Sequence, residues 1–165
     1  MKKLKRESDF SLKFFTSYFY QVRFFKPNQL PISTALWDPK WFHDNRGQDY
    51  AFKDKRGIWN GIRCSRLAPG PTCENLCRGK EGCSDSPEHC RFLMAYRKQL
   101  NDLDFNQFIK DVEKIVAAAG LNSDEAEVIL LVHEKYDNLC SERNALLNWL
   151  NDNGIEAKEL DYPIK

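Results

Sequence analysis

Residues 127–133 constrain the fold of this chain more than any other segment. They read Glu-Val-Ile-Leu-Leu-Val-His, with five aliphatic residues in an unbroken row. A run of that length without alternating polar residues is typical of a strand that is buried on both faces of a parallel sheet. The run therefore predicts a parallel β-sheet at the centre of the protein.

Helical patterns are found on both sides of that run. Asp104 is a good helix N-cap, and apolar residues recur after it with helical spacing until Gly120 ends the pattern. A second helix is expected after a loop at 134–139 and ends at residues 153–154, an Asn-Gly pair. A shorter helix is expected over residues 90–100. The central strand is thus expected to have helices before and after it.

Three further segments have the composition of strands. Residues 12–20 and 30–36 are rich in aromatic, aliphatic and β-branched types, and residues 155–160 follow the last helix. Strands that alternate with helices indicate an α/β fold with a mostly parallel sheet flanked by helices. The chain has 165 residues, which is the length of one domain, so residues 1–165 are expected to form a single α/β domain.

The composition excludes two classes of protein. With 42% hydrophobic and 30% charged residues, the chain is neither an integral membrane protein nor fully disordered, since its apolar runs fall far short of the roughly 20 residues that a bilayer requires. The basic N-terminus precedes neither an apolar stretch nor a cleavage site, so no secretory signal is expected. We therefore expect a cytoplasmic protein without a membrane partner.

The net charge of +1 hides an uneven distribution. Residues 1–63 carry 13 basic and 6 acidic side chains, whereas residues 101–165 carry 6 and 14. The positive front half favours an anionic ligand, although two halves that pair in the fold would have the same composition.

The front half also contains a long aromatic and basic stretch at 37–63. Such residues can line a groove for a nucleotide or a nucleic acid, through stacking and phosphate contacts. The alternative is that the tryptophans cover the core beneath a long loop. The residues in question are Trp37, Trp41, His43, Arg46, Lys53, Lys55, Arg56, Trp59 and Arg63.

The candidate catalytic residues follow the apolar strand. Glu134 is expected at the carboxyl end of that strand, where parallel sheets bind ligands, as an acid or a base. Cys140 is expected in the first turn of the next helix, where its pKa would be depressed, and Arg143 is suited to clamping a carboxylate or phosphate. Together they favour an enzyme-like site for a small anionic, nucleotide-like substrate. In the structural alternative, Cys140 is a small buried residue, and Glu142 and Arg143 are solvated helix charges.

The order of these features resembles the domain of unknown function 488 family. A strand, a glutamate, a short loop, a Cys-x-x-Arg helix start and an Ala-Leu-Leu-x-Trp-Leu helix follow one another over residues 127–150. Shorter similarities lie at 15–18, 32–33, 39–41 and 67–69. The resemblance implies an α/β Rossmann-like fold with no established reaction.

The resemblance also bears on the site. By position, Glu134, Cys140 and Arg143 correspond to the family's polar cluster. The family commonly carries Leu-Leu-Cys-x-Glu at the strand end and Cys-His-Arg at the helix start. This chain instead has His133 directly before the glutamate and reads Cys-Ser-Glu-Arg at the helix start, so a Cys–His pair would require His133 to approach from the strand.

Residues 64–91 form a cysteine-rich insertion that we expect to be irregular, since it is rich in glycine and proline and lacks apolar periodicity. Four thiolates within 18 residues suit tetrahedral zinc or an iron–sulfur cluster in a closed structural site. These four are Cys73, Cys77, Cys83 and Cys90. Disulfides and unligated thiols are the alternatives, and Cys64 and His89 stay unassigned. A metal-held segment also suits a protein-binding surface, so an interaction module is a further alternative function.

Overall fold

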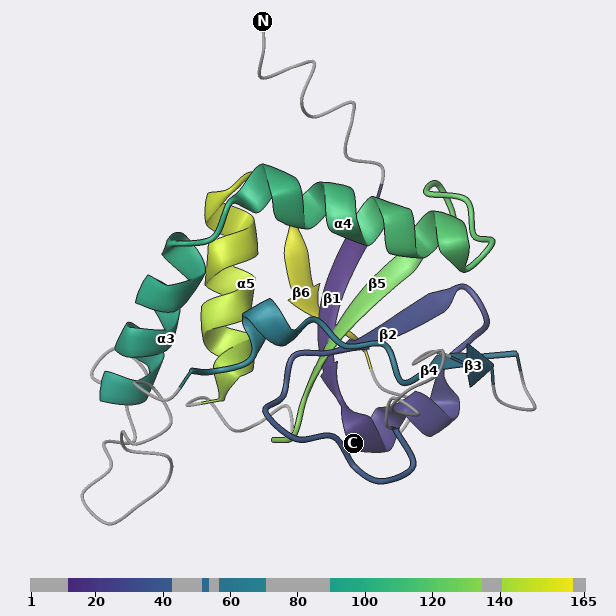
Figure 1. The fold of residues 1–165 in the computed structure, drawn as a ribbon, viewed down its shortest axis with the longest axis horizontal. Helices are drawn as coiled ribbons and strands as arrows, with labels where there is room; N and C mark the ends of the chain where they lie inside the picture. The colour runs from purple at the N-terminus through teal and green to yellow at the C-terminus, as the bar shows by residue number, and fades with distance from the viewer. Residues whose placement is uncertain (1–11, 43–51, 54–56, 71–89, 135–140, 162–165) are drawn as a thin grey trace, which may run out of the picture.

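The computed structural model describes residues 12–42, 52–53, 57–70, 90–134 and 141–161. Within them, four strands form one sheet in the order β2-β5-β1-β6, and every neighbouring pair is parallel. Helices flank this sheet (Figure 1), so the expected α/β Rossmann-like fold is confirmed. The strands are β1 (Lys13–Tyr18), β2 (Gln29–Ser33), β5 (Glu127–Val132) and β6 (Ala157–Glu159).

The central strand β5 is the one that the apolar run predicted. It lies between β1 and β2 and pairs Leu130 with Thr16 on one side and with Ile32 on the other. Residues 128–132 are 0% exposed, because neighbouring strands and covered faces exclude water from all sides of β5.

Three α-helices pack on one face of the sheet, which we call the helical face (Figure 1). Their apolar sides and alternate strand residues, such as Phe14 and Leu130, form the larger hydrophobic core. The predicted ends of the middle helix are confirmed, since the Asp104 side chain caps its first turn and Gly120 follows it with a φ of 77°. The helices are α3 (Arg91–Asn101), α4 (Phe105–Ala118) and α5 (Glu142–Asp152).

Shorter elements cover the other face, which we call the loop face. The 3₁₀ helix η1 (Phe19–Phe24) and the loop at 34–42 pack there against Ile129 and Leu131 in a smaller core. No described helix is both long and apolar enough to cross a bilayer. The remaining described elements are β3 (Phe52–Lys53) paired with β4 (Trp59–Asn60), and the 3₁₀ helix η2 (Ser65–Leu67).

The expected strands are longer than the observed ones. The strand expected at 12–20 ends at Tyr18, because the next residues turn into η1 and place their apolar side chains on the loop face. The strand expected at 30–36 ends at Ser33, since the chain then leaves the sheet edge for the loop that follows. The one expected at 155–160 is the three-residue β6.

The cysteine-rich insertion is described only at its two ends. Residues 64–70 contain η2, and Cys90 precedes α3 as its N-cap. Residues 71–89 lie outside the described part of the chain, so the irregular insertion stays a prediction.

The connections that leave β1 and β5 run toward opposite edges of the sheet, although the two strands are neighbours. After β1 the chain passes through η1 on the loop face to reach β2, beyond β5. After β5 it passes through α5 on the helical face to reach β6, beyond β1. In open α/β sheets, a reversal of this kind marks the carboxyl ends of the two strands as the edge where ligands bind.

Candidate functional site at the carboxyl edge

Arg143 joins three elements at the carboxyl edge of the sheet. It lies in the first turn of α5, and its side chain is 5% exposed. Its Nε donates to Oε1 of Glu159 at 2.9 Å, and its Nη2 donates to the carbonyl oxygen of Glu134 at 2.6 Å. The guanidinium also faces Tyr18, 6.0 Å from the ring centre. One buried cation thus ties α5 to β6, to β1 and to the chain after β5.

Glu159 is the anionic partner in this network. Thr16 Oγ1 donates to Glu159 Oε1 at 2.5 Å, the same oxygen that Arg143 binds. The second oxygen, Oε2, is shielded from solvent and has no hydrogen-bond partner among the described residues. Burial raises the pKa of Glu159 above its ordinary value, although the Thr16 hydroxyl and the Arg143 charge oppose the rise. Glu159 therefore holds a proton more readily than a solvated glutamate.

Glu134 lies two residues beyond β5, at the predicted position. Its carbonyl is fixed by Arg143, and its carboxylate oxygen Oε1 is shielded from solvent without a partner in the described part of the chain. Such an oxygen gains strongly from any hydrogen-bond donor that reaches it. The cluster of Arg143, Glu159 and Glu134 therefore holds two carboxylate oxygens suited to a ligand that donates hydrogen bonds.

The structural alternative for the start of α5 is wrong in one respect. Glu142 and Arg143 are not solvated helix charges, since they are 5% and 4% exposed. The helix starts later than expected, because Ser141 is its N-cap and accepts the Arg143 N–H. Cys140, which precedes this cap, lies outside the described residues.

The loop at 34–42, which follows β2, is anchored to the sheet by polar contacts. Ser33 Oγ donates to Asp38 at 2.5 Å, and Arg63 forms an ion pair with the same carboxylate at 3.1 Å. Arg63 also donates to the Ala35 carbonyl at 3.0 Å. These contacts hold the loop in one conformation at the carboxyl end of the sheet.

Two tryptophans on this loop are presented to solvent. Trp37 is 71% exposed, so the alternative that it covers the core is wrong. Trp41 is 46% exposed, and the rest of its ring lies against the smaller core. The backbone carbonyl of Trp37 is hydrogen-bonded to His133 Nε2. Phe19 packs against both Trp41 and His133, with ring centres 6.2 and 4.9 Å away. The aromatic surface therefore continues from the loop to the end of β5.

Other members of the predicted aromatic groove turn toward the protein. Trp59 is half-buried against the larger core, and its Nε1 donates to the Ala119 carbonyl at 3.3 Å. Arg63 is engaged by Asp38, as described above. Four other members, His43, Arg46, Lys55 and Arg56, lie outside the described residues.

Only one of the four predicted metal ligands is described. Cys90 is 2% exposed, and its Sγ accepts the Leu93 N–H at 3.5 Å as the N-cap of α3. Cys64 is half-buried, and burial raises the pKa of its thiol. Cys73, Cys77 and Cys83 lie outside the described residues. Across the described ranges, no three His, Cys, Asp or Glu side chains gather closely enough to hold a metal ion.

Three residues of the site were not predicted from the sequence. Thr16 and Tyr18 read as ordinary strand residues, and Glu159 as one acidic residue near the C-terminus. Their proximity depends on the pairing of β1 with β6, which matches Thr16 with Glu159. Comparison with protein-family models, with curated proteins and with solved structures finds no match to this chain.

Proposed function

We propose that this chain is an enzyme-like protein that binds a small nucleotide-like molecule at the carboxyl edge of its sheet. The observation that carries the proposal is Trp37, a largely exposed indole on an anchored loop at the carboxyl edge of the sheet. An exposed aromatic side chain on a fixed loop exposes apolar surface to water unless a partner covers it. A flat heterocyclic base is such a partner, since it stacks on indole without requiring a particular hydrogen-bond pattern.

The polar cluster would act on the part of the ligand that reaches the ends of β1 and β5. Glu134 is assigned the acid or base, because its Oε1 is shielded from solvent and has no hydrogen-bond partner among the described residues. Cys140 is assigned the nucleophile, on the basis of its place before α5. Arg143 is a positioning residue, since two of its nitrogens already hold Glu159 and the Glu134 carbonyl.

The test compares two probes, AMP and ribose 5-phosphate, by titration of the purified chain with isothermal calorimetry. We expect AMP to bind and ribose 5-phosphate to bind at least about tenfold more weakly, because only AMP carries a base to stack. Trp37→Ala should abolish that preference. Met94→Ala is the matched control, since Met94 is 55% exposed and belongs to α3 on the helical face, whereas Trp37 lies on the 34–42 loop. Equal binding of the two probes, or no binding of AMP, would overturn the proposal.

Thiol chemistry tests the catalytic assignment separately. Rapid alkylation of Cys140 by iodoacetamide near neutral pH is expected, with Cys64 reacting slowly because burial raises the pKa of its thiol. Equally slow reaction of both residues in the folded protein would remove Cys140 as the nucleophile.

A second candidate function is the binding of single-stranded nucleic acid. The observation that favours it is the exposed sequence around Trp37 and Trp41, with Lys40 also exposed between them. Stacked bases and phosphate contacts would follow one another along such a surface. Affinity for an oligonucleotide that falls steeply with salt supports this function, and AMP would then bind far more weakly than the oligonucleotide.

We also propose a structural zinc ion or iron–sulfur cluster held by Cys73, Cys77, Cys83 and Cys90. Four soft thiolates suit either group, and the N–H···S bond that Cys90 accepts is compatible with a bound thiolate. The proposal depends on the reducing cytoplasm expected from the sequence. Metal analysis after anaerobic purification should find zinc or iron, and finding neither removes the proposal.

Membership in the domain of unknown function 488 family is proposed on the residues quoted above. It is supported by the positions of Glu134 just beyond β5 and of Arg143 in the first turn of α5. A crystal structure with anomalous scattering would identify the metal and show whether Glu134, Cys140 and Arg143 converge on one cavity. Side chains that point apart would contradict the shared site.

A further inference from the structure

A pocket of about 300 Å³ lies on the loop face, beside η1 and the end of β6. Phe24, Phe25 and Leu160 supply its apolar walls, and Gln21, Lys26 and Asp161 also line it. Its volume is at the lower end of the range for small-molecule sites, which corresponds to a ligand of one ring with small substituents. None of its lining residues belongs to the Arg143 cluster.

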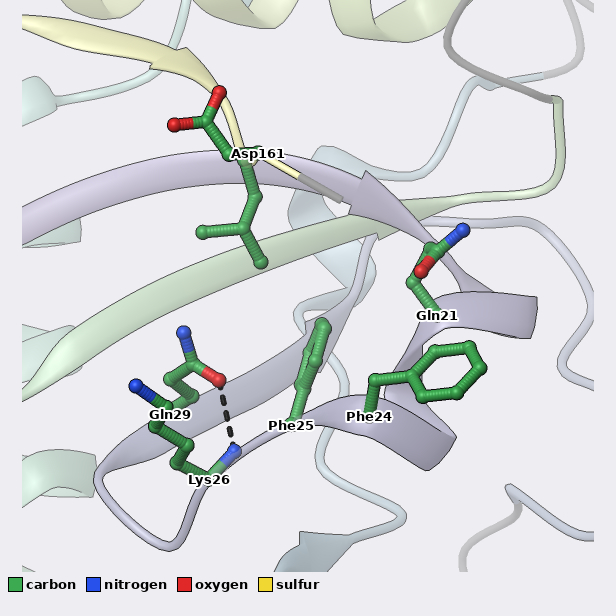
Figure 2. Close-up of a pocket in the computed structure, with 7 residues that line it drawn as sticks. Gln21, Phe24, Phe25, Lys26, Gln29 and Asp161 are labelled. Carbon is green, nitrogen blue, oxygen red and sulfur yellow. Dashed lines mark hydrogen bonds between the residues drawn. The ribbon is translucent and has the colours of Figure 1, made fainter. Parts of the chain in front are cut away.

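Gln21 supplies a polar group inside this pocket. The residue is 1% exposed, and its Nε2 lies 2.9 Å from the Tyr18 hydroxyl oxygen, to which it donates. Figure 2 shows the amide oxygen turned toward Phe25 and the amide nitrogen turned away. A carbonyl oxygen has two lone pairs, so Gln21 can accept a hydrogen bond from a ligand in the pocket. The bond to Tyr18 fixes the direction of that acceptor.

Lys26 lies on the opposite side of Phe25 from Gln21 (Figure 2). Its backbone N–H donates to Gln29 Oε1 at 2.8 Å, and Gln29 Nε2 donates to Glu127 at 2.9 Å, so the turn that carries Lys26 is anchored. Asp161 directs its carboxylate away from the other labelled side chains (Figure 2). Of the two charged lining residues, Lys26 is thus the one whose long, exposed side chain can bring its charge to a ligand in the pocket.

We propose that this pocket is a second ligand site, which binds a small aromatic acid carrying a hydroxyl or amino group. The ring packs between Phe25 and Leu160, the hydroxyl or amino group donates to Gln21, and the carboxylate meets Lys26. This site is separate from the nucleotide-like site proposed above, because its walls come from η1, the start of β2 and the end of β6.

The test is an NMR titration of the full ¹⁵N-labelled chain with 4-hydroxybenzoate, benzoate and phenol. Saturable shifts of the Gln21 and Lys26 signals are expected for 4-hydroxybenzoate. Its affinity should exceed that of benzoate by about fivefold, which is the value of one hydrogen bond. Lys26→Gln should weaken 4-hydroxybenzoate by about threefold to fivefold, the value of an exposed ion pair, and leave phenol unchanged.

Two control variants make the outcome decisive. Lys110→Gln removes another exposed charge, on α4, and should change nothing, and Trp37→Ala should abolish the preference for AMP over ribose 5-phosphate but leave 4-hydroxybenzoate unaffected. Gln21→Met should abolish the preference for 4-hydroxybenzoate over benzoate. The absence of saturable shifts at millimolar probe, or equal effects of Lys26→Gln and Lys110→Gln, would overturn the second site.

Discussion

The two faces of the sheet differ in what covers them and in what they expose. On the helical face, α3, α4 and α5 bury one continuous core that includes Trp149 and Tyr96, both at or below 1% exposure. On the loop face, η1 and the 34–42 loop bury a smaller core around Ile129 and Leu131. Helices with an apolar stripe cover a sheet more completely than short irregular segments do.

We propose that stability and ligand binding are divided between the two faces. The exposed rings of Trp37 and Trp41 and the pocket beside η1 all belong to the loop face or its rim. A surface loop such as 34–42 can present its side chains to a ligand if a few contacts hold it on the sheet. Asp38 makes two such contacts, with Ser33 and with Arg63. The helical face then supplies most of the free energy of unfolding.

Truncation of an aromatic residue on each face should show the largest contrast. Trp149 packs against Phe105 and Phe108, with ring centres 5.1 and 5.2 Å away. Trp149→Ala is therefore expected to lower the free energy of unfolding by about 3–5 kcal/mol, through lost burial and a cavity. Trp41→Ala should cost less than about 1 kcal/mol, because nearly half of that ring is already solvated. Equal losses in urea denaturation would contradict the division between the faces.

Removal of the buried cation should have the next largest effect. Arg143→Met leaves Glu159 buried without its charge partner, so a loss of about 3 kcal/mol in unfolding free energy is expected. Arg97→Met is the matched control, since Arg97 pairs with Asp152 at 2.6 Å but that carboxylate is exposed. The control should cost no more than about 1 kcal/mol. Similar losses for the two variants would show that burial of the Arg143 network is energetically unimportant.

The titration of Glu159 should give a smaller effect with a defined sign. Because burial raises its pKa above the ordinary glutamate value, the folded state binds more protons than the unfolded state once the pH reaches that ordinary range. Stability from this group therefore falls with rising pH until the raised pKa is passed. A glutamine does not titrate, so Glu159→Gln lacks this pH-dependent contribution to the free energy of unfolding. As the pH rises from the ordinary glutamate pKa to the raised one, wild type should therefore lose stability relative to the variant.

Urea denaturation from about pH 4 to about pH 8 measures that difference, and the window brackets the ordinary glutamate pKa. Glu156→Gln is the control, since Glu156 is exposed in the same connection before β6. A difference between wild type and Glu159→Gln that stays constant, or that changes in the opposite direction, would contradict the raised pKa.

The anchor of the 34–42 loop should give the smallest change in stability. Asp38→Asn retains an acceptor for Ser33 but removes the charge that binds Arg63, so a loss of about 1 kcal/mol is expected. AMP affinity should fall severalfold, because the loop that carries Trp37 is held less firmly. Asp111→Asn, which removes an exposed pair with Arg66, should change neither quantity. If Asp38→Asn leaves the AMP affinity unchanged, the Asp38 contacts are not needed for AMP binding.

The sequence predicted those parts of the fold that depend on local patterns. The apolar run at 127–133 and the capped pattern from Asp104 to Gly120 correspond to β5 and α4, because burial and capping leave a clear periodicity. The position of Glu134 at the end of β5 was predicted for the same reason. Residues 19–20 were expected to be the end of the first strand but begin η1, since aromatic residues suit a strand and a buried 3₁₀ helix alike.

The partners of Arg143 could not be predicted from local patterns. Glu159 lies 16 residues away in the sequence and Thr16 lies 143 residues from Glu159. These side chains come together only because β6 pairs with β1 at the edge opposite β5. The three-residue sequence of β6 does not indicate which strand it pairs with. The sequence left open whether Trp37 lines a groove or covers the core, because a tryptophan suits either place and only the anchors of its loop hold it outward.

The most direct test of the central claim is a map of AMP-induced chemical shift changes on the full labelled chain. Ligand binding at the carboxyl edge predicts saturable changes at residues 18–20, 34–42 and 133–134, with α4 unaffected. Changes confined to the amino ends of the strands, or to the helical face, would contradict it.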